Sequence, residues 1–230
     1  GSEMCIRDRY NRRGFIHNSE NIFRHCADRT DYAVLYFNVR NFKAVNELFG
    51  IDTGDSVLRT IYKNMRSSSL KPCVVARVEA DQFTCLVEKK NLDFDALSGL
   101  CEWNFTKKGK TMHIFCGCGI FFVENKEMSI NGMIDRAKLA KKYITDEYVK
   151  PYNIYDASMK SYYIDRAELA GELRNGLAQE QFKVYYQPVV DAKTGEIRSA
   201  EALIRWVHPK RGFVSRAIFI PALEESGHIS

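Results

Sequence analysis

Two short apolar runs joined by only four residues constrain the fold of this chain more than any other feature. Val74–Val78 and Phe83–Val87 are rich in β-branched and aromatic residues, and Glu79–Gln82 connects them. Such a pair predicts an antiparallel hairpin. Elsewhere strand-like runs alternate with helical segments, an order that by itself favours a parallel sheet. The hairpin interrupts that order, so we expect an α+β or mixed α/β domain whose mixed sheet is flanked by helices.

Apolar spacing predicts the remaining elements of this domain. A buried strand is expected over Tyr32–Phe37, because six apolar or aromatic residues follow one another there. A helix over Phe42–Phe49 is expected to end at Gly50, and Asp52 is expected to cap the next helix. The other predicted elements are a loose helix within 11–26, a helix from Phe94 to about Trp103, a long strand over Met112–Val123, a helix from Ser129 to about Ile144 and a short strand over Asn153–Tyr155.

The C-terminal part of the chain shows a second pattern. Apolar residues between Met159 and Leu177 recur at helical spacing, and we interpret this segment as a connector helix. It is followed by two expected strands, Phe182–Pro188 and Ile197–Val207, and by a last helix within 216–225.

Composition and charge narrow the possible functions. The chain of 230 residues is 45% hydrophobic and 27% charged, as folded rather than disordered proteins are. Its net charge of +5 is scattered along the sequence, which argues against binding to nucleic acid or to an anionic membrane. No apolar run approaches the roughly 20 residues of a membrane span. The seven cysteines lack the spacing of zinc sites, and we interpret them as buried free thiols in a reducing cytoplasm.

Residues 1–9 fit neither the pattern of the first domain nor that of the C-terminal part. They have no helical or strand periodicity, and we interpret them as a non-native, adaptor-derived segment that replaces the true N-terminus. The alternative is a Gly-Ser tag remnant followed by a few native residues. We exclude the segment from the fold on either interpretation.

Four motifs of the first domain resemble a known family. Asn11–Arg13, Phe42–Asn46, the Gly54-Asp55 pair and Arg77–Phe83 match, in order and spacing, the landmarks of the GGDEF diguanylate cyclases. The resemblance covers residues 10–157. It implies a nucleotidyl-cyclase (palm, ferredoxin-like) fold, and enzymes of this family condense two GTP molecules into cyclic di-GMP.

The charges that such chemistry needs are missing from the matched positions. Attack on an α-phosphate requires divalent metals, and these require carboxylates at the end of the first strand and in the hairpin. Asn38, a neutral amide, stands at the strand end, and Gln82 replaces one hairpin carboxylate. Asp81 alone is retained, as a weak residual metal ligand, and Arg40 adds positive charge on the same strand face as Asn38. We therefore expect no cyclase activity from this degenerate site.

Nucleotide binding without turnover remains an open hypothesis. By resemblance, Asn46 and Asp55 would read the guanine edge, and Lys43 would contact phosphate. Arg40 and Lys43 would then offset phosphate charge in place of a metal. Purely structural roles are equally open, because Asp55 can stabilise a helix N-terminus while Asn46 and Lys43 can be surface residues. The family's product-inhibition motif is absent at Leu70 and Cys73, and its C-terminal lysine is replaced by Thr145. The candidate nucleotide-binding set is Asn38, Arg40, Lys43, Asn46, Asp55 and Asp81.

The C-terminal strands resemble the start of a second family. Tyr185–Pro188, Glu201–Leu203, the Arg205-Trp206 pair and Phe219–Pro221 match the opening of the EAL phosphodiesterases. These enzymes hydrolyse cyclic di-GMP to pGpG in a TIM-like barrel with Mg²⁺ or Mn²⁺. Strand alternation places Glu201, Leu203 and Arg205 on one face, which suits a metal and an anionic phosphate at a barrel mouth.

By carry-over from this resemblance, Glu201 would bind metal, and Gln187, Leu203 and Arg205 would contact the substrate. The alternative is an exposed, ion-paired edge strand.

These features predict four segments. Residues 1–9 are the non-native segment, 10–157 the degenerate GGDEF domain, 158–181 the connector helix and 182–230 the truncated start of an EAL domain. A complete barrel takes about 250 residues, so no complete catalytic site is expected in this chain.

We interpret the chain as a fragment of a cytoplasmic cyclic-di-GMP signalling protein. Its parent would hydrolyse cyclic di-GMP, and the GGDEF domain would act as a GTP-binding regulatory module. A non-catalytic receptor or scaffold and a residual cyclase are the alternatives. The expected ligands are GTP and cyclic di-GMP, the parent's cofactor is Mg²⁺ or Mn²⁺, and a homodimer or membrane tether of the parent is left open.

Overall fold

The computed structural model describes residues 11–107 and 109–225. The chain divides into two compact units, with the boundary between Met159 and Lys160, and each unit is described by itself. The predicted adaptor-derived segment, residues 1–9, lies outside the described residues.

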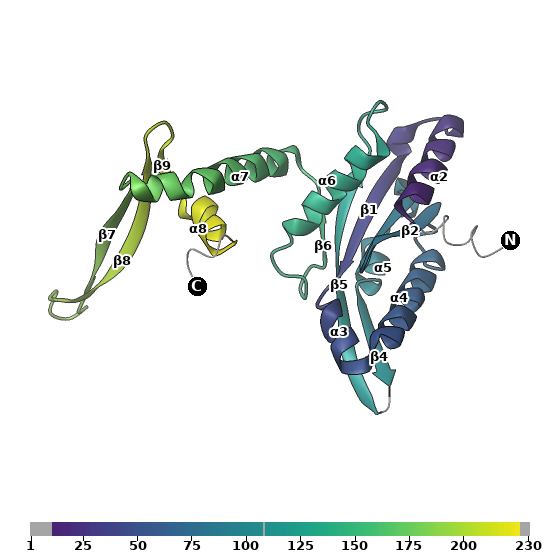
Figure 1. The fold of residues 1–230 in the computed structure, drawn as a ribbon, viewed down its shortest axis with the longest axis horizontal. Helices are drawn as coiled ribbons and strands as arrows, with labels where there is room; N and C mark the ends of the chain where they lie inside the picture. Colours follow the sequence, from purple (N-terminus) through teal and green to yellow (C-terminus); the bar gives the residue numbers. More distant parts are fainter. Residues whose placement is uncertain (1–10, 108, 226–230) are drawn as a thin grey trace. The chain divides into compact units, whose positions relative to one another are not determined.

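The first unit contains one mixed sheet covered by helices (Figure 1). Its helices are α2 (Arg12–His25), α3 (Phe42–Phe49), α4 (Ile51–Arg66), α5 (Phe94–Gly99) and α6 (Ile130–Lys142), with short 3₁₀ turns η1 (Arg29–Asp31) and η2 (Lys89–Asn91). Its strands are β1 (Tyr32–Val39), β2 (Val74–Glu79), β3 (Gln82–Glu88), β4 (Glu102–Lys107), β5 (Lys110–Phe122) and β6 (Tyr152–Ile154).

The strand order is β2-β3-β1-β5-β4, and every neighbouring pair in this order is antiparallel. β6 pairs in parallel with the second half of β5. The predicted mixed sheet with an inserted hairpin is therefore confirmed. β1 lies in the middle, where seven of its eight residues are buried.

Side-chain alternation along β1 divides the interior into two cores. Ala33, Leu35, Phe37 and Val39 face one core, which the apolar stripe of α4 completes, whereas Val34 and Tyr36 face the other, which α2 and α6 complete. Figure 1 shows α4 and α6 on opposite sides of the sheet. Each fully buried leucine, isoleucine or phenylalanine contributes about 1.5–3 kcal/mol, so the two cores dominate the stability of this unit.

Two helix boundaries follow from local chemistry, one as predicted and one not. Gly50 ends α3 with a φ of 84°, in the left-handed region that glycine adopts without strain. The same Gly50 also precedes the first residue of α4, so the prediction of Asp52 as the cap was wrong. Asp52 lies instead in the first turn of α4, where its charge suits the helix dipole.

The segment after α5 differs from its prediction. The helix expected to reach Trp103 ends at Gly99, and Glu102–Lys107 forms β4, paired with the first half of β5. Trp103 and Phe105 alternate with polar residues and pack against the first core. This period of two is the signal of a strand, and it outweighs the helical spacing that Phe94 and Leu97 begin.

The second unit is a small sheet packed on two helices. It contains α7 (Ala157–Ala178) from Lys160 onward, β7 (Phe182–Val190), β8 (Ile197–His208), β9 (Gly212–Val214) and α8 (Arg216–Glu225). β7, β8 and β9 form an antiparallel sheet in that order. β9 has no counterpart among the predicted elements. The core of the second unit consists of Leu169, Leu173, Trp206, Val214, Phe219 and Leu223. A TIM-like barrel built on these strands stays a prediction.

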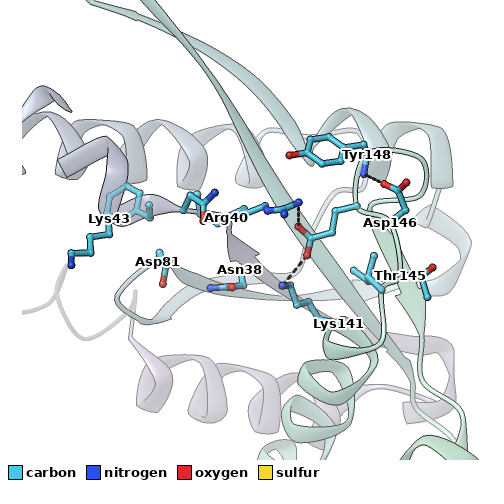
Figure 2. A pocket seen from close by; sticks show the side chains of 13 residues that line it. Asn38, Arg40, Lys43, Asp81, Lys141, Thr145, Asp146 and Tyr148 are labelled. Carbon is cyan, nitrogen blue, oxygen red and sulfur yellow. Dashed lines mark hydrogen bonds and ion pairs between the residues drawn. The ribbon is translucent and has the colours of Figure 1, made fainter. Parts of the chain in front are cut away.

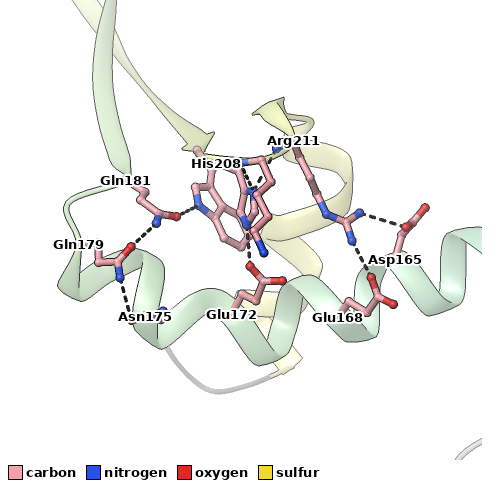
Figure 3. A network of polar contacts seen from close by, with 10 residues as sticks. Asp165, Glu168, Glu172, Asn175, Gln179, Gln181, His208 and Arg211 are labelled. Atoms are coloured by element: carbon pink, nitrogen blue, oxygen red, sulfur yellow. Dashed lines mark hydrogen bonds and ion pairs between the residues drawn. The ribbon is translucent and has the colours of Figure 1, made fainter.

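A polar network fastens α7 to the turn after β8 (Figure 3). His208 is 4% exposed, and its Nε2 lies 2.6 Å from Glu172 Oε2. Its Nδ1 accepts hydrogen bonds from the backbone N–H groups of Lys210 and Arg211, so the ring proton is on Nε2 and is donated to Glu172. This hydrogen bond lowers the pKa of Glu172 below its ordinary value. Arg211 adds ion pairs to Asp165 and Glu168 of the same helix, at 3.0 and 2.6 Å.

The cysteines of the described part are all free thiols. Cys85, Cys101, Cys116 and Cys118 are buried, as expected, and burial raises the pKa of the Cys85 thiol to about 12. Cys73 is exposed and Cys26 half-buried, so the prediction of buried thiols was wrong for these two. No helix within the described ranges is long and apolar enough to cross a membrane.

Candidate functional site

The C-terminal end of β1 is held between its two neighbouring strands. Asn38 pairs with Gln82 of β3 on one side and with Gly117 of β5 on the other. Just beyond it, the N–H of Val39 donates to the carbonyl of Asp81, 3.1 Å away. The tip of the β2–β3 hairpin is thereby fixed beside the end of β1, so Asn38 and Asp81 open onto the same space.

That space is a cleft of about 780 Å³. It brings together four residues of the candidate nucleotide-binding set, namely Asn38, Arg40, Lys43 and Asp81 (Figure 2). The rest of its lining is Val39, Asn41, Phe42, Lys141, Ile144, Thr145, Asp146, Glu147 and Tyr148. The cleft is therefore built from the end of β1, the start of α3, the hairpin tip, the last turn of α6 and the segment that follows it.

Glu147 is an acid in this cleft that sequence reasoning missed. Its Oε1 lies 2.9 Å from Lys141 Nζ, and its Oε2 lies 3.9 Å from Arg40 Nη1. The side chain of Glu147 is 14% exposed and that of Lys141 22%, so this pair is largely shielded from water. Arg40 also lies over the ring of Tyr148, 5.2 Å from its centroid. One carboxylate thus lies between two cations in the cleft, and the three side chains together keep a net positive charge.

The other acids of the cleft do not complete a metal site. Asp146 Oδ1 accepts the backbone N–H groups of Tyr148 and Val149, which uses that oxygen to form the loop. Glu147 is paired with cations, and Asn38 is neutral, which leaves Asp81. Within residues 11–107 and 109–225, no three histidine, cysteine, aspartate or glutamate side chains are grouped closely enough to hold a metal ion. The donor set therefore does not fit the metal pair of a cyclase.

The hairpin tip is strained where the resembled family has glycine. Ala80 has a φ of 32°, in the left-handed region that costs an L-residue roughly 1–2 kcal/mol. The guanidinium Nε of Arg77 donates to the carbonyl of Ala80 and holds this conformation. A register shift between Arg77 and Glu79 accompanies it.

Asn46 and Asp55 are not part of the cleft lining. They lie on the adjoining helices α3 and α4. Asn46 Oδ1 is buried, and it has no hydrogen-bond partner among the described residues. A Cβ at residue 54 would overlap this oxygen, so Gly54 leaves the room that the Asn46 side chain occupies. A buried acceptor without a partner costs about 1–3 kcal/mol.

Lys43 reaches solvent rather than the interior of the cleft. Its side chain is 90% exposed, and its Nζ lies 3.6 Å from Glu47 Oε1, one helical turn later.

A sequence signal for Lys141 did exist. Thr145 stands where the resembled family has a lysine, and Lys141 lies four residues earlier in the sequence, within the predicted helix that runs to about Ile144. Figure 2 shows Lys141 and Thr145 on the same side of the cleft. No comparable signal exists for Glu147 and Tyr148, because they belong to a loop whose course is set by tertiary packing.

In the second unit, strand register juxtaposes the other candidate residues. Gln187 of β7 lies directly opposite Glu201 of β8, a relation in which Cβ atoms are about 4.5–5.5 Å apart. Leu203 and Arg205 continue the same face of β8, opposite Tyr185 and Lys183. Glu201 is exposed, Leu203 is buried and Arg205 is half-buried. Arg205 also lines a smaller cleft with residues 213–216.

Comparison with known proteins gives two successive family matches. Residues 8–143 match the family model described as "Diguanylate cyclase, GGDEF domain", and residues 170–230 match the one described as "EAL domain".

Curated relatives align with most of this chain. The chain is 27% identical to the bifunctional diguanylate cyclase/cyclic di-GMP phosphodiesterase MucR of Pseudomonas aeruginosa, with 88% of this chain and 30% of that protein aligned. It is 29% identical to the cyclic di-GMP phosphodiesterase PdeR of Escherichia coli K12, over 88% of this chain and 31% of that protein. The chain thus spans about a third of the length of these relatives.

Among solved structures, an EAL/GGDEF domain protein from M. capsulatus superimposes with a TM-score of 0.51 and 21% identity. The match covers 63% of this chain and 98% of that one. At this identity the likeness establishes the fold of the first unit.

Proposed function

The chain belongs to the GGDEF family, since that family's model matches more than half of it, and from this premise we propose that its first unit binds guanine nucleotide without cyclising it. An EAL-type segment follows in the same chain, and the relatives named above are called cyclic di-GMP phosphodiesterases. The proposal is therefore that this chain is part of a cyclic-di-GMP signalling protein in which the GGDEF unit regulates rather than synthesises.

The observation that supports this proposal best is the charge arrangement of the cleft. Formation of a 3′–5′ phosphodiester from GTP needs metal-bound oxygens on both sides of the α-phosphate. One carboxylate against a divalent ion at about 4 Å is worth up to roughly 8 kcal/mol at an effective dielectric near 20. If desolvation cancels all but about 3 kcal/mol, the loss at Asn38 still weakens metal binding about a hundredfold. The positive charges of Lys141 and Arg40 weaken the binding of a divalent metal ion further.

In this proposal, residues of α3 and α4 recognise the guanine base. The unpartnered Asn46 Oδ1 provides a buried acceptor, and the Asp55 carboxylate can accept the N–H groups of a guanine edge. Lys43, Arg40 and Lys141 supply positive charge for the phosphates. The proposal needs no metal, because Arg40 and Lys141 together carry one positive charge more than the Glu147 carboxylate that lies between them, and Lys43 adds positive charge.

The role of the second unit is proposed for the parent protein. Glu201 would supply one metal ligand for Mg²⁺ or Mn²⁺, and Gln187, Leu203 and Arg205 would contact cyclic di-GMP. The register that sets Gln187 opposite Glu201 supports this grouping. One carboxylate does not hold two metal ions, so hydrolysis to pGpG is proposed only for the longer protein.

Calorimetric titration of the 230-residue chain with GTP, ATP and guanosine tests the proposal. We expect GTP to bind at micromolar to millimolar concentration without Mg²⁺, and ATP to bind more weakly. Asp55→Asn should weaken GTP binding about tenfold or more, since it removes an acceptor for the guanine edge. Asp52→Asn is the matched control, because Asp52 is exposed in the same helix. Absence of GTP binding at millimolar concentration would refute the proposal.

A further inference from the structure

The ion-paired Glu147 is the feature of the cleft that the proposed function leaves unexplained. Its carboxylate lies between Lys141 Nζ at 2.9 Å and Arg40 Nη1 at 3.9 Å. The absence of a side chain at Gly117 leaves room for this pair. A Cβ at residue 117 would lie 2.6 Å from Lys141 Cε and 2.7 Å from Glu147 Oε1. Gly117 of β5 therefore allows this pair to settle against the sheet.

The same two cations are suited to an anion from outside. A phosphate group offers several acceptor oxygens, and a guanidinium and an ammonium that converge on one oxygenated group are a typical phosphate-binding pair. Arg40 directly follows β1, and Lys141 lies in the last turn of α6, so the backbone of each adjoins or belongs to regular structure. The backbone N–H of Arg40 also donates to the carbonyl of Phe115, at 2.8 Å. The backbone that carries each cation is thus held in place independently of Glu147.

We propose that the Glu147 carboxylate is an internal competitor of the triphosphate for Arg40 and Lys141, the two cations that the proposed function gives to the phosphates. This inference rests on the proposed nucleotide-binding function and adds a regulation to it. Phosphate enters only when Glu147 swings out, so the affinity for a triphosphate is set by the balance between an internal and an external anion.

The segment that carries Glu147 has the freedom that such an exchange needs. It lies between α6 and β6, outside any helix or strand. Its neighbours Tyr148 and Val149 are among the most exposed large apolar side chains of the described residues. Tyr148 nevertheless packs edge-on against Phe115, with ring centroids 4.7 Å apart. The loop is therefore anchored beside the cleft while the glutamate side chain can rotate.

The test uses inorganic tripolyphosphate, which has the phosphates of GTP and no base. Calorimetry on the full chain compares wild type with Glu147→Gln and Glu147→Ala. We expect both substitutions to tighten tripolyphosphate binding on the order of tenfold, because the competing charge is gone. Glu124→Gln is the matched control, since it removes the same charge from an exposed position outside the cleft. Adding Lys141→Met to Glu147→Gln should abolish the gain.

The outcomes separate this inference from the proposed function. Unchanged or weaker tripolyphosphate binding in folded Glu147 variants overturns the inference, even if GTP binds as proposed. Tighter tripolyphosphate binding without any GTP preference over ATP upholds the anion site and contradicts guanine recognition. Equal tightening by Glu124→Gln would reveal a net-charge effect only and would also overturn it.

If the Glu147 variants fail to fold, a chemical-modification experiment on the wild-type chain tests the proposal instead. Tripolyphosphate at millimolar concentration should protect the Lys141 amine from acetylation, measured by peptide mass spectrometry. Unprotected Lys141 would contradict the proposal.

Discussion

Gly119→Ala tests how closely α6, which carries Lys141, is seated on the sheet. A Cβ at residue 119 would overlap the carbonyl oxygen of Ala137 and lie 2.5 Å from the backbone N of Lys141, where ordinary contact begins at about 3.4 Å. These are backbone atoms of α6, so no side-chain rotation relieves the clash. The helix would have to shift by roughly 1 Å and loosen the core around Met133 and Ala137. Overpacking of this kind costs about 3 kcal/mol or more.

Gly117→Ala is the informative companion, because the same Cβ is added two residues earlier on the same face of β5. There it meets only the ends of the Lys141 and Glu147 side chains, which can rotate away. We expect a cost within about 1 kcal/mol, together with loss of the ion pair. Gly99→Ala is the control, since nothing lies within 4 Å of its added Cβ.

Hydrogen exchange of the α6 and β5 amides under native conditions is the suitable assay, because the two units need not unfold together. The account predicts a large loss of protection for Gly119→Ala, a small one for Gly117→Ala and almost none for Gly99→Ala. Equal protection in the Gly119 and Gly117 variants would refute the reasoning from backbone contact.

Three further predictions follow from single contacts. Ala80→Gly should stabilise the first unit by up to about 1 kcal/mol in urea unfolding, because it relieves the positive φ; a destabilised variant would contradict the strain. Asn38→Asp should tighten Mn²⁺ binding about a hundredfold by electron paramagnetic resonance, whereas Asn38→Gln should not, and equal affinities would refute the charge argument. The lowered pKa of Glu172 means that its stabilisation is present above its unfolded pKa of about 4.3 and is lost as pH falls through the folded value. The thermal stability of the second unit should therefore decrease below about pH 4, and Glu172→Gln should flatten this dependence; an unaltered pH profile in the variant would contradict it.

The sequence predicts the first unit best where one local signal acts alone. The dense run of β1 and the hairpin of β2 and β3 were predicted because their spacing has no competing interpretation. β4 was missed because Phe94 and Leu97 begin a helical spacing just before Trp103 and Phe105 begin an alternating one. The alternation wins only because β5 is present to pair with it, and a window of the sequence does not contain that partner.

The residues of the candidate site were likewise predicted only where a local sequence signal exists. Asn38, Arg40, Lys43 and Asp81 were found by motif position, and the structure gathers them in one cleft. Glu147 was not found, since its place depends on the course of a loop between α6 and β6. Its pairing with Lys141 requires Gly117, a residue 30 positions away in sequence that nothing in a local pattern links to it.

Product formation from GTP is the measurement that tests the central claim most directly. The purified 230-residue chain would be incubated with GTP and either Mg²⁺ or Mn²⁺, and the nucleotides would be separated by chromatography with mass detection. The account predicts intact GTP, with neither pppGpG nor cyclic di-GMP, because the cleft lacks the carboxylates that hold a metal pair. Accumulation of either product, in proportion to the amount of chain, would contradict it.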